Sequence, residues 1–418
     1  MQMGLGALSV LLIWQIATYS LSAALSYSNP NLALTLNANN STARLNLADQ
    51  AISTEFGDTL AMIDIGAAKA AQAAGLAPST SANPTSHQPD NKIHDWVSGA
   101  LASDPLNAHA IASLGALAAF SGDTGAATRF MIGATKRTLR ERTAVAWMMR
   151  DRFEAGDYSK SLYYADALAR LSWQAAQSIM PYLGRLAENP KSSAEFSERL
   201  KSNPPWRPTF FDNLSGNISD ARTPLSLLLS LKDSNSPPTL NELKAYSALL
   251  LQHQMYDLAY NAWLQFLAPE QLAKAGFLFN GGFDFEPSSF AFDWTPAKAK
   301  GLLIDRVGRA DRPGDMALMI EFGGARIDPV LLSQTVMLPP GTYRFEGLIS
   351  GNVRARRGLS WSLHCINQAT AEAQKLELPT ALRPEAWTEF VMPLTVPTSD
   401  CGAQVVQLQI NSHAPSDT

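Results

Sequence analysis

Charged residues are scarce in this sequence. They make up 17% of the 418 residues, and the formal net charge is −4 at pH 7. Soluble domains carry about 25% charged residues, and a nucleic-acid-binding protein needs a basic surface to neutralise phosphates. The composition therefore argues against nucleic acid as a partner and fits a chain that works beside a membrane or another protein. The length allows two or three domains.

Motifs for catalysis and for metal binding are missing. The six histidines are scattered, with no His-x-x-x-His or Cys-x-x-Cys spacing that would indicate a transition-metal site. There is no Gly-x-Ser-x-Gly elbow, no Gly-x-x-x-x-Gly-Lys phosphate loop and no dinucleotide fingerprint. The sequence thus predicts that the protein is not an enzyme, that it needs no catalytic cofactor and that it has no transition-metal site.

Only two cysteines occur, Cys365 and Cys401. In an oxidising compartment they would form one disulfide, which stabilises a fold by about 2–4 kcal/mol. In a reducing compartment they would be two buried thiols that pack as small apolar side chains. An export signal at the N-terminus would favour the disulfide.

Charge is absent from the first 43 residues, and an apolar run extends from Met3 to about Tyr27. About 20 apolar residues suffice to cross a bilayer as a helix, so residues 1–27 predict a transmembrane anchor. A cleaved secretory signal peptide is the alternative. Against it, no Lys or Arg precedes the run, and the run is long.

Helical patterns fill the next part of the chain. Residues 28–90 predict a connector and a first helix, and residues 91–275 predict a series of short helices. Gly122-Asp123 and Gly156-Asp157 lie 34 positions apart, each between two helical patterns, and residues 253–263 form a third, partial copy. This period resembles the tetratricopeptide repeat, whose stacked helix pairs offer a concave face to a peptide or protein. An ordinary helical domain with two coincident turns is the alternative.

Alternating hydrophobicity replaces the helical patterns after residue 276. Segments 342–350, 358–365 and 404–410 carry apolar side chains at every second position, with Gly and Pro turns between the segments. Trp361 shares its face with apolar neighbours and is expected in the core. Several such strands predict an antiparallel β-sandwich over residues 276–418.

Three segments of this region resemble galactose-binding-like jelly rolls, the fold of many carbohydrate-binding modules. Residues 279–294, with Asn280-Gly281-Gly282-Phe283 near the start, resemble the first strand of that fold. Residues 339–345 resemble its Pro-Gly turn and the strand that follows, and residues 387–390 resemble an aromatic strand near its end. The resemblance implies a jelly-roll fold for residues 276–418.

Aromatic and basic side chains of this region are the candidate ligand contacts. Exposed indoles pack on sugar rings, so Trp294 and Trp387 are candidates to face a glycan. The loop residues Arg354, Arg356 and Arg357 are candidates to meet an acidic polysaccharide.

Acidic side chains cluster in the stretch 279–294. Asp284 and Glu286 are a candidate site for a structural Ca²⁺ ion, which takes carboxylate oxygens as ligands. Together with Asp293 they are also candidates for the paired acids of a glycoside hydrolase, which lie about 5–9.5 Å apart. Solvated acids beside a first strand are the commoner case, so we expect no catalysis there.

The order of anchor, helical repeats and jelly roll resembles accessory proteins of bacterial exopolysaccharide assembly and export. The resemblance implies a non-enzymatic scaffold, single-pass in the bacterial inner membrane, with the bulk of the chain in the periplasm. Its expected partners are a membrane protein complex and, as a second candidate, polysaccharide. A carbohydrate-binding module on a helical stalk is the alternative function, and a glycan hydrolase or lyase is a third interpretation.

Overall fold

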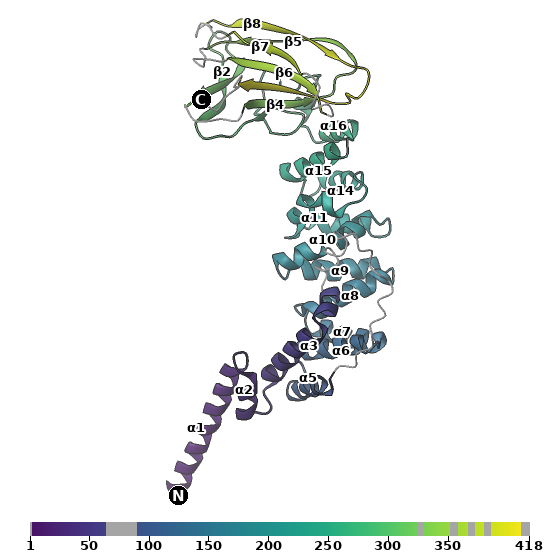
Figure 1. Cartoon of the computed structure of the whole chain (residues 1–418), viewed down its shortest axis with the longest axis vertical. Helices are drawn as coiled ribbons and strands as arrows, with labels where there is room; N and C mark the ends of the chain where they lie inside the picture. The colour runs from purple at the N-terminus through teal and green to yellow at the C-terminus, as the bar shows by residue number, and fades with distance from the viewer. Residues whose placement is uncertain are drawn as a thin grey trace. The chain divides into compact units, whose positions relative to one another are not determined.

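The computed structural model describes residues 2–63, 90–323, 329–351, 358–366, 373–379 and 386–410. The chain divides into two compact units, Met1–Pro237 and Pro238–Thr418, called here the helical unit and the β unit. Figure 1 follows the chain from the helices of the first unit to the strands of the second. The predicted order, helices first and antiparallel strands second, is confirmed.

The helical unit contains α1 (Gln2–Leu25), α2 (Pro30–Leu36), α3 (Ser41–Ile63), α5 (Asn91–Ser103), α6 (Ala108–Phe120), α7 (Thr124–Arg137), α8 (Arg142–Glu154), α9 (Tyr158–Ala169), α10 (Trp173–Glu188), α11 (Ser193–Lys201), α12 (Arg207–Asp212), α13 (Leu214–Asn217) and α14 (Thr223–Lys232). The β unit begins with α15 (Leu240–Gln252), α16 (Tyr256–Gln265) and α17 (Pro269–Leu272). Its strands are β1 (Thr295–Pro296), β2 (Leu302–Gly308), β3 (Met316–Phe322), β4 (Val330–Val336), β5 (Gly341–Ile349), β6 (Leu359–Cys365), β7 (Gln374–Glu377), β8 (Thr388–Val396) and β9 (Gln404–Ile410).

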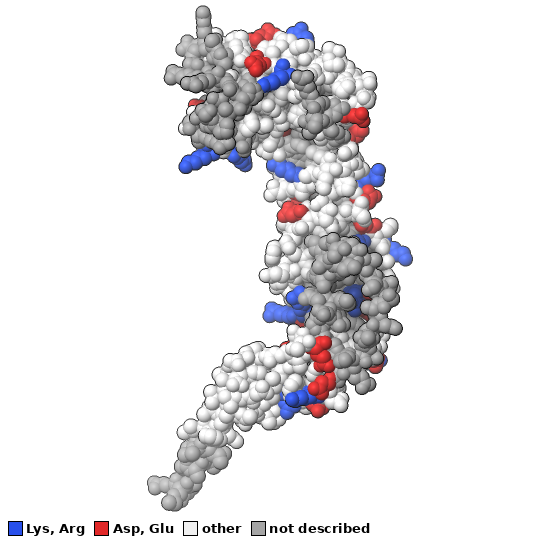
Figure 2. Space-filling model, viewed as in Figure 1, with Lys and Arg blue, Asp and Glu red and all other residues white. Residues whose placement is uncertain are grey.

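A small polar network ties the C-terminal end of α1 to α2 and α3. The buried Ser22 hydroxyl donates to the carbonyl of Ala33 at 2.7 Å. The Asn40 side chain donates to the hydroxyls of Ser22 and Ser26, at 2.8 and 2.9 Å. Beyond this network α1 exposes apolar side chains such as Trp14, and on the face drawn in Figure 2 the described part of α1 is white, without Lys, Arg, Asp or Glu.

The sequence predicts a transmembrane anchor over residues 1–27. In the part of the chain that the structure describes, no helix combines the length and the apolar character needed to cross a bilayer. The predicted span is therefore not found there.

The first Gly-Asp motif forms a turn that ends α6 and begins α7. Gly122 adopts φ 83°, a left-handed conformation that glycine tolerates without a side-chain clash. The backbone N–H of Asp123 donates to the carbonyl of Ala118 at 2.9 Å, five residues earlier, as in a Schellman C-cap. The Asp123 carboxylate then accepts from the N–H of Ala126 at 2.7 Å and caps α7.

The second motif repeats the same turn between α8 and α9. Gly156 has φ 73°, and the N–H of Asp157 bonds to the carbonyl five residues earlier at 2.9 Å. The turn between α15 and α16 has the same geometry without Gly or Asp: Gln254 has φ 57°, and Met255 makes the five-residue hydrogen bond at 2.9 Å but no side-chain cap. The paired helices predicted from the 34-residue spacing are confirmed.

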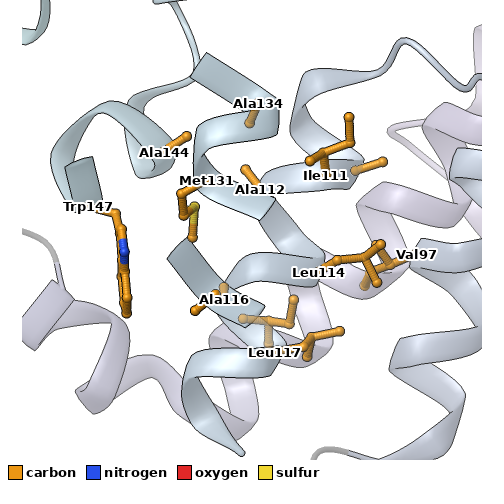
Figure 3. Packing of buried hydrophobic residues seen from close by; sticks show 14 of the residues in the cluster. Val97, Ile111, Ala112, Leu114, Ala116, Leu117, Met131, Ala134, Ala144 and Trp147 are labelled. Atoms are coloured by element: carbon orange, nitrogen blue, oxygen red, sulfur yellow. The ribbon is translucent and has the colours of Figure 1, made fainter. Parts of the chain in front are cut away.

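Small side chains allow the paired helices to pack closely. A β-carbon at Gly115 of α6 would lie 3.0 Å from Cε of Met131 of α7. Figure 3 shows Met131 in the core that also contains Val97 of α5, Leu114 of α6 and Trp147 of α8. Neighbouring pairs therefore share one hydrophobic core.

The strands of the β unit form three antiparallel sheets. The largest has the order β1-β4-β9-β6-β7, and β2–β3 and β5–β8 form two separate pairs. The strands predicted in segments 342–350, 358–365 and 404–410 are present as β5, β6 and β9. Burial alternates in β5 and β9, whereas β6 is buried on both faces. Trp361 and Leu408 of the large sheet pack with Met392 of β8 in one core, so the prediction for Trp361 is also confirmed.

The predicted disulfide is present. Cys365, at the end of β6, is bonded to Cys401, which lies just before β9. The bond joins the ends of two strands that pair directly, since Cys365 lies opposite Gln404 in the β6–β9 ladder. Disulfides persist in oxidising compartments outside the cytoplasm.

Helices α15, α16 and α17 belong to the β unit, and α16 packs on the loop that precedes its strands. The ring of Trp263 of α16 lies 4.9 Å from that of Phe279 and 5.6 Å from that of Phe292. The sequence pattern changes near residue 276, whereas the compact unit begins at Pro238.

Candidate functional site: a cleft in the β unit

The stretch 279–294 is a hydrogen-bonded loop, not the first strand that the sequence predicts. The Asn280 side chain donates to the carbonyl of Phe285 at 2.8 Å and accepts from its N–H at 3.0 Å. The buried Asp293 carboxylate accepts from the N–H and hydroxyl of Ser288, at 2.8 and 2.7 Å. Asn and Asp compete in this way with strand pairing, so only Thr295–Pro296 pairs as β1.

One part of this loop lines a cleft. Gly281, Gly282 and Phe283 contribute to the lining. Phe283 has φ 55°, which is rare for a bulky residue. Its N–H donates to the carbonyl of Asn280 at 3.0 Å, and its ring packs 5.7 Å from that of Trp294, so local contacts hold the strained conformation.

The cleft has a volume of about 410 Å³. Its lining combines the large sheet with both two-stranded sheets, which makes it an opening into the β core. The residues are Gly281, Gly282, Phe283, Arg309, Met316, Ala317, Leu318, Ile320, Phe322, Leu332, Gly347, Leu348, Ile349, Ser350, Gly351, Leu359, Trp361, Leu378, Trp387, Phe390 and Leu408. Small-molecule sites in proteins have volumes of about 300–1,000 Å³, so the cleft is large enough for a ligand.

Arg309 and Trp387 form the polar part of the lining. The guanidinium carbon of Arg309 lies 4.3 Å from the centre of the Trp387 ring, within the range of a cation–π contact. Arg309 also donates to both carboxylate oxygens of Asp311, at 3.1 and 2.7 Å. Arg309 lowers the pKa of Asp311 through these bonds, and Trp387 contributes in the same direction.

An aromatic wall stands opposite a glycine. The rings of Trp361 and Phe390 stack with their centres 6.3 Å apart, and Phe390 lies across from Gly347 in the β5–β8 ladder. A β-carbon at Gly347 would lie 2.6 Å from Cζ of Phe390. Glycine at this position therefore permits the ring to lie where it does.

The predicted glycan-facing residues have different outcomes. Trp294 is 2% exposed and its indole donates to the carbonyl of Asn280 at 2.9 Å, so it is a core residue and presents no face to a ligand. That prediction is wrong because the loop folds over the indole. Trp387 does line the cleft. Arg354, Arg356 and Arg357 lie outside the described residues.

The predicted ion site is not assembled. The carboxylate of Asp284 pairs with Lys274 at 2.9 Å, and that of Glu286 approaches Arg306 at 3.5 Å. Asp293 uses its oxygens within the loop. Over the described ranges, no three His, Cys, Asp or Glu side chains are placed to hold a metal ion together. Each acid thus has its own local partner.

Sequence reasoning missed the partners of Trp387. Arg309 and Asp311 sit in the β2–β3 turn, so the contact of Arg309 with Trp387 depends on tertiary structure. The i, i+2 spacing of Arg309 and Asp311 was the available local signal. This spacing indicates an ion pair but does not predict the contact of Arg309 with the Trp387 ring.

A second cluster was also missed, in the helical unit. His109 of α6 contacts Asp49 of α3 through Nε2 at 2.9 Å and Glu141, at the start of α8, through Nδ1 at 3.2 Å. Hydrogen bonds first to Asp49 and then to Glu141 raise the pKa of His109 from 6.5 to about 10. The imidazole is therefore positively charged at neutral pH and ties together three helices.

No protein-family model matches this chain, and a search of curated proteins gives no match either.

Proposed function

We propose that this chain is a non-enzymatic scaffold outside the cytoplasm, in which the paired helices form a tetratricopeptide-type solenoid that binds a protein partner. The repeated turn carries the proposal: Gly122-Asp123 and Gly156-Asp157 build the same C-cap and N-cap 34 residues apart. Stacked pairs of this kind provide an extended surface for protein binding.

The β unit, in this proposal, is a jelly-roll binding module. The antiparallel sheets that share one core support this fold, and the disulfide supports a periplasmic position. The expected partner is an integral membrane protein of bacterial polysaccharide assembly or export. This last step rests on the resemblance in domain order alone.

Exposed aromatic side chains mark where a partner would bind the helical unit. Trp173 at the start of α10 is 64% exposed and Tyr163 of α9 is 48% exposed. Tryptophan and tyrosine are enriched among the residues that dominate binding energy at protein interfaces. An exposed tryptophan with no role in the helical core therefore suits a contact with a partner.

Affinity purification tests the proposal. Tagged full-length protein at native abundance, extracted in mild detergent, is expected to retain an integral membrane partner. The variant Trp173→Ala should weaken this complex roughly 30-fold, because loss of an anchor residue costs about 2 kcal/mol. Leu272→Ala, an exposed leucine of the β unit, is the matched control. Monodisperse, partner-free protein would contradict the proposal.

The carbohydrate-binding alternative retains one of its two tryptophans. Trp387 lines the cleft, but Arg309 covers a face of its indole. Titration of the full chain with neutral and acidic glycans tests this function directly. Glycan binding that Trp387→Ala abolishes would establish it.

A further inference from the structure

The described lining of the cleft in the β unit carries no net charge. Among the lining residues that the structure describes, Arg309 is the charged one. Its Nε and Nη2 atoms donate to the two carboxylate oxygens of Asp311, which neutralises it. An anionic or cationic ligand would have to break this pair to gain a partner. The electrostatics thus favour a neutral ligand.

The side chains of the described lining also offer few hydrogen bonds. Arg309 donates to Asp311 and lies over the Trp387 ring, and Ser350 already engages a partner. The floor consists of side chains from the core of the large sheet, among them Leu332 and Leu408. A ligand rich in hydroxyl groups would leave many of these groups unpaired, which is unfavourable in a buried site. An apolar ligand has no hydrogen-bonding groups that would be left unpaired there.

The cleft runs along β3. Met316, Ala317, Leu318, Ile320 and Phe322 of this strand contribute to its lining. At about 3.3 Å per residue, residues 316–322 extend over roughly 20 Å. This length, together with a volume of about 410 Å³, suits an extended apolar chain.

We propose that the cleft binds a single neutral hydrocarbon chain, the tail of a lipid whose head group remains outside. This inference is independent of the proposed scaffold function, since it concerns the β unit alone. Apolar side chains such as Leu318 and Ile320 are only half-buried in the chain by itself. A bound tail would remove them from water, which is the main favourable contribution to such binding.

Photolabelling of the full chain tests this assignment. The probe is a long-chain primary alcohol with a diazirine in its chain, and labelled peptides are identified by mass spectrometry. Label is expected within residues 316–322 and at residues 387–390. Excess unlabelled alcohol should lower this label about tenfold or more, and a neutral oligosaccharide should not. Label on α1, whose apolar side chains are exposed, serves as an internal reference.

Variants locate the site. Leu318→Trp fills the cleft and should lower the label within residues 316–322 about tenfold, whereas Leu303→Trp, on an exposed face of β2, should leave it within about twofold. Gly347→Ala displaces the Phe390 ring and should also lower the label, which guards against misfolding of the first variant. Label that is confined to α1, equal in all variants, or displaced by the oligosaccharide would overturn the proposal.

Discussion

Replacing His109 by glutamine should lower the stability of the helical unit, and the loss should depend on pH. The wild-type imidazolium lies between the carboxylates of Asp49 and Glu141, at 2.9 and 3.2 Å. Glutamine keeps a hydrogen-bond donor but has no charge. The substitution therefore removes the ionic part of the contact among α3, α6 and α8.

The magnitude follows from the pKa of His109, which is raised from 6.5 to about 10. Undiscounted, this difference would correspond to about 5 kcal/mol at 1.36 kcal/mol per pH unit. The side chains of His109 and Asp49 are 42% and 46% exposed, so water screens the interaction strongly. Exposed pairs contribute about 0.2–1 kcal/mol each. With two carboxylates, one of them well buried, we expect about 1–2 kcal/mol.

The sign of the pH dependence is fixed by the direction of the shift. Because the folded pKa of His109 lies above the unfolded one, its contribution is complete below about pH 6.5 and is lost as the pH rises to about 10. Urea unfolding of wild type and His109→Gln at several pH values between 6 and 10.5 measures the difference. Other titrating groups cancel in that comparison. His94→Gln, an exposed histidine of α5, is the control.

A difference between wild type and His109→Gln that stays constant with pH, or grows toward pH 10, would refute this reasoning. A constant difference would mean that packing, not charge, holds the imidazole.

Three other changes give separate outcomes. Asp157→Ala removes the N-cap of α9 and should cost about 1 kcal/mol in urea unfolding. Replacing both Cys365 and Cys401 by serine should lower stability by about 3–4 kcal/mol, from the entropy of the open loop, with no further loss on adding reductant. A fragment of residues 238–418 should give a cooperative melt, whereas residues 277–418 should aggregate, as size-exclusion chromatography would show.

The helical turns were predictable because their information is local. Gly122 supplies the left-handed conformation, and Asp123 supplies an oxygen for the N-terminus of α7. Both signals recur 34 residues later. The turn at Gln254 shows the limit of this reasoning, because the same backbone hydrogen bond forms there with neither residue. Helix packing on both sides holds Gln254 at φ 57° against its own preference.

The strands were predictable where the residues of one face are more buried than those of the other, as in β9. The stretch 279–294 was not, because its aromatic side chains suggested a strand while its polar ones formed a loop. Asn280 and Asp293 each satisfy several backbone groups at once. These hydrogen bonds join residues up to fourteen positions apart. Hydrophobic periodicity does not predict them.

The cleft could not be predicted at all from residue types. Trp294 and Trp387 look alike in the sequence, yet one is buried and the other lines an opening. The difference arises from their neighbours: the carbonyl of Asn280 binds the first indole, and Arg309 covers the second. The tertiary structure therefore decides which of the two indoles is accessible in the cleft.

The loop 279–294 also explains why the β unit begins well before its first strand. Phe279 and Phe292 pack on Trp263 of α16, while Phe283 lines the cleft. A chain cut at residue 277 would lose Trp263 and expose two rings that are now 3% and 1% exposed. Their exposure would disturb the same loop that lines one part of the cleft. Helices α15 and α16 are therefore structural parts of the β unit and should be present in any test of ligand binding.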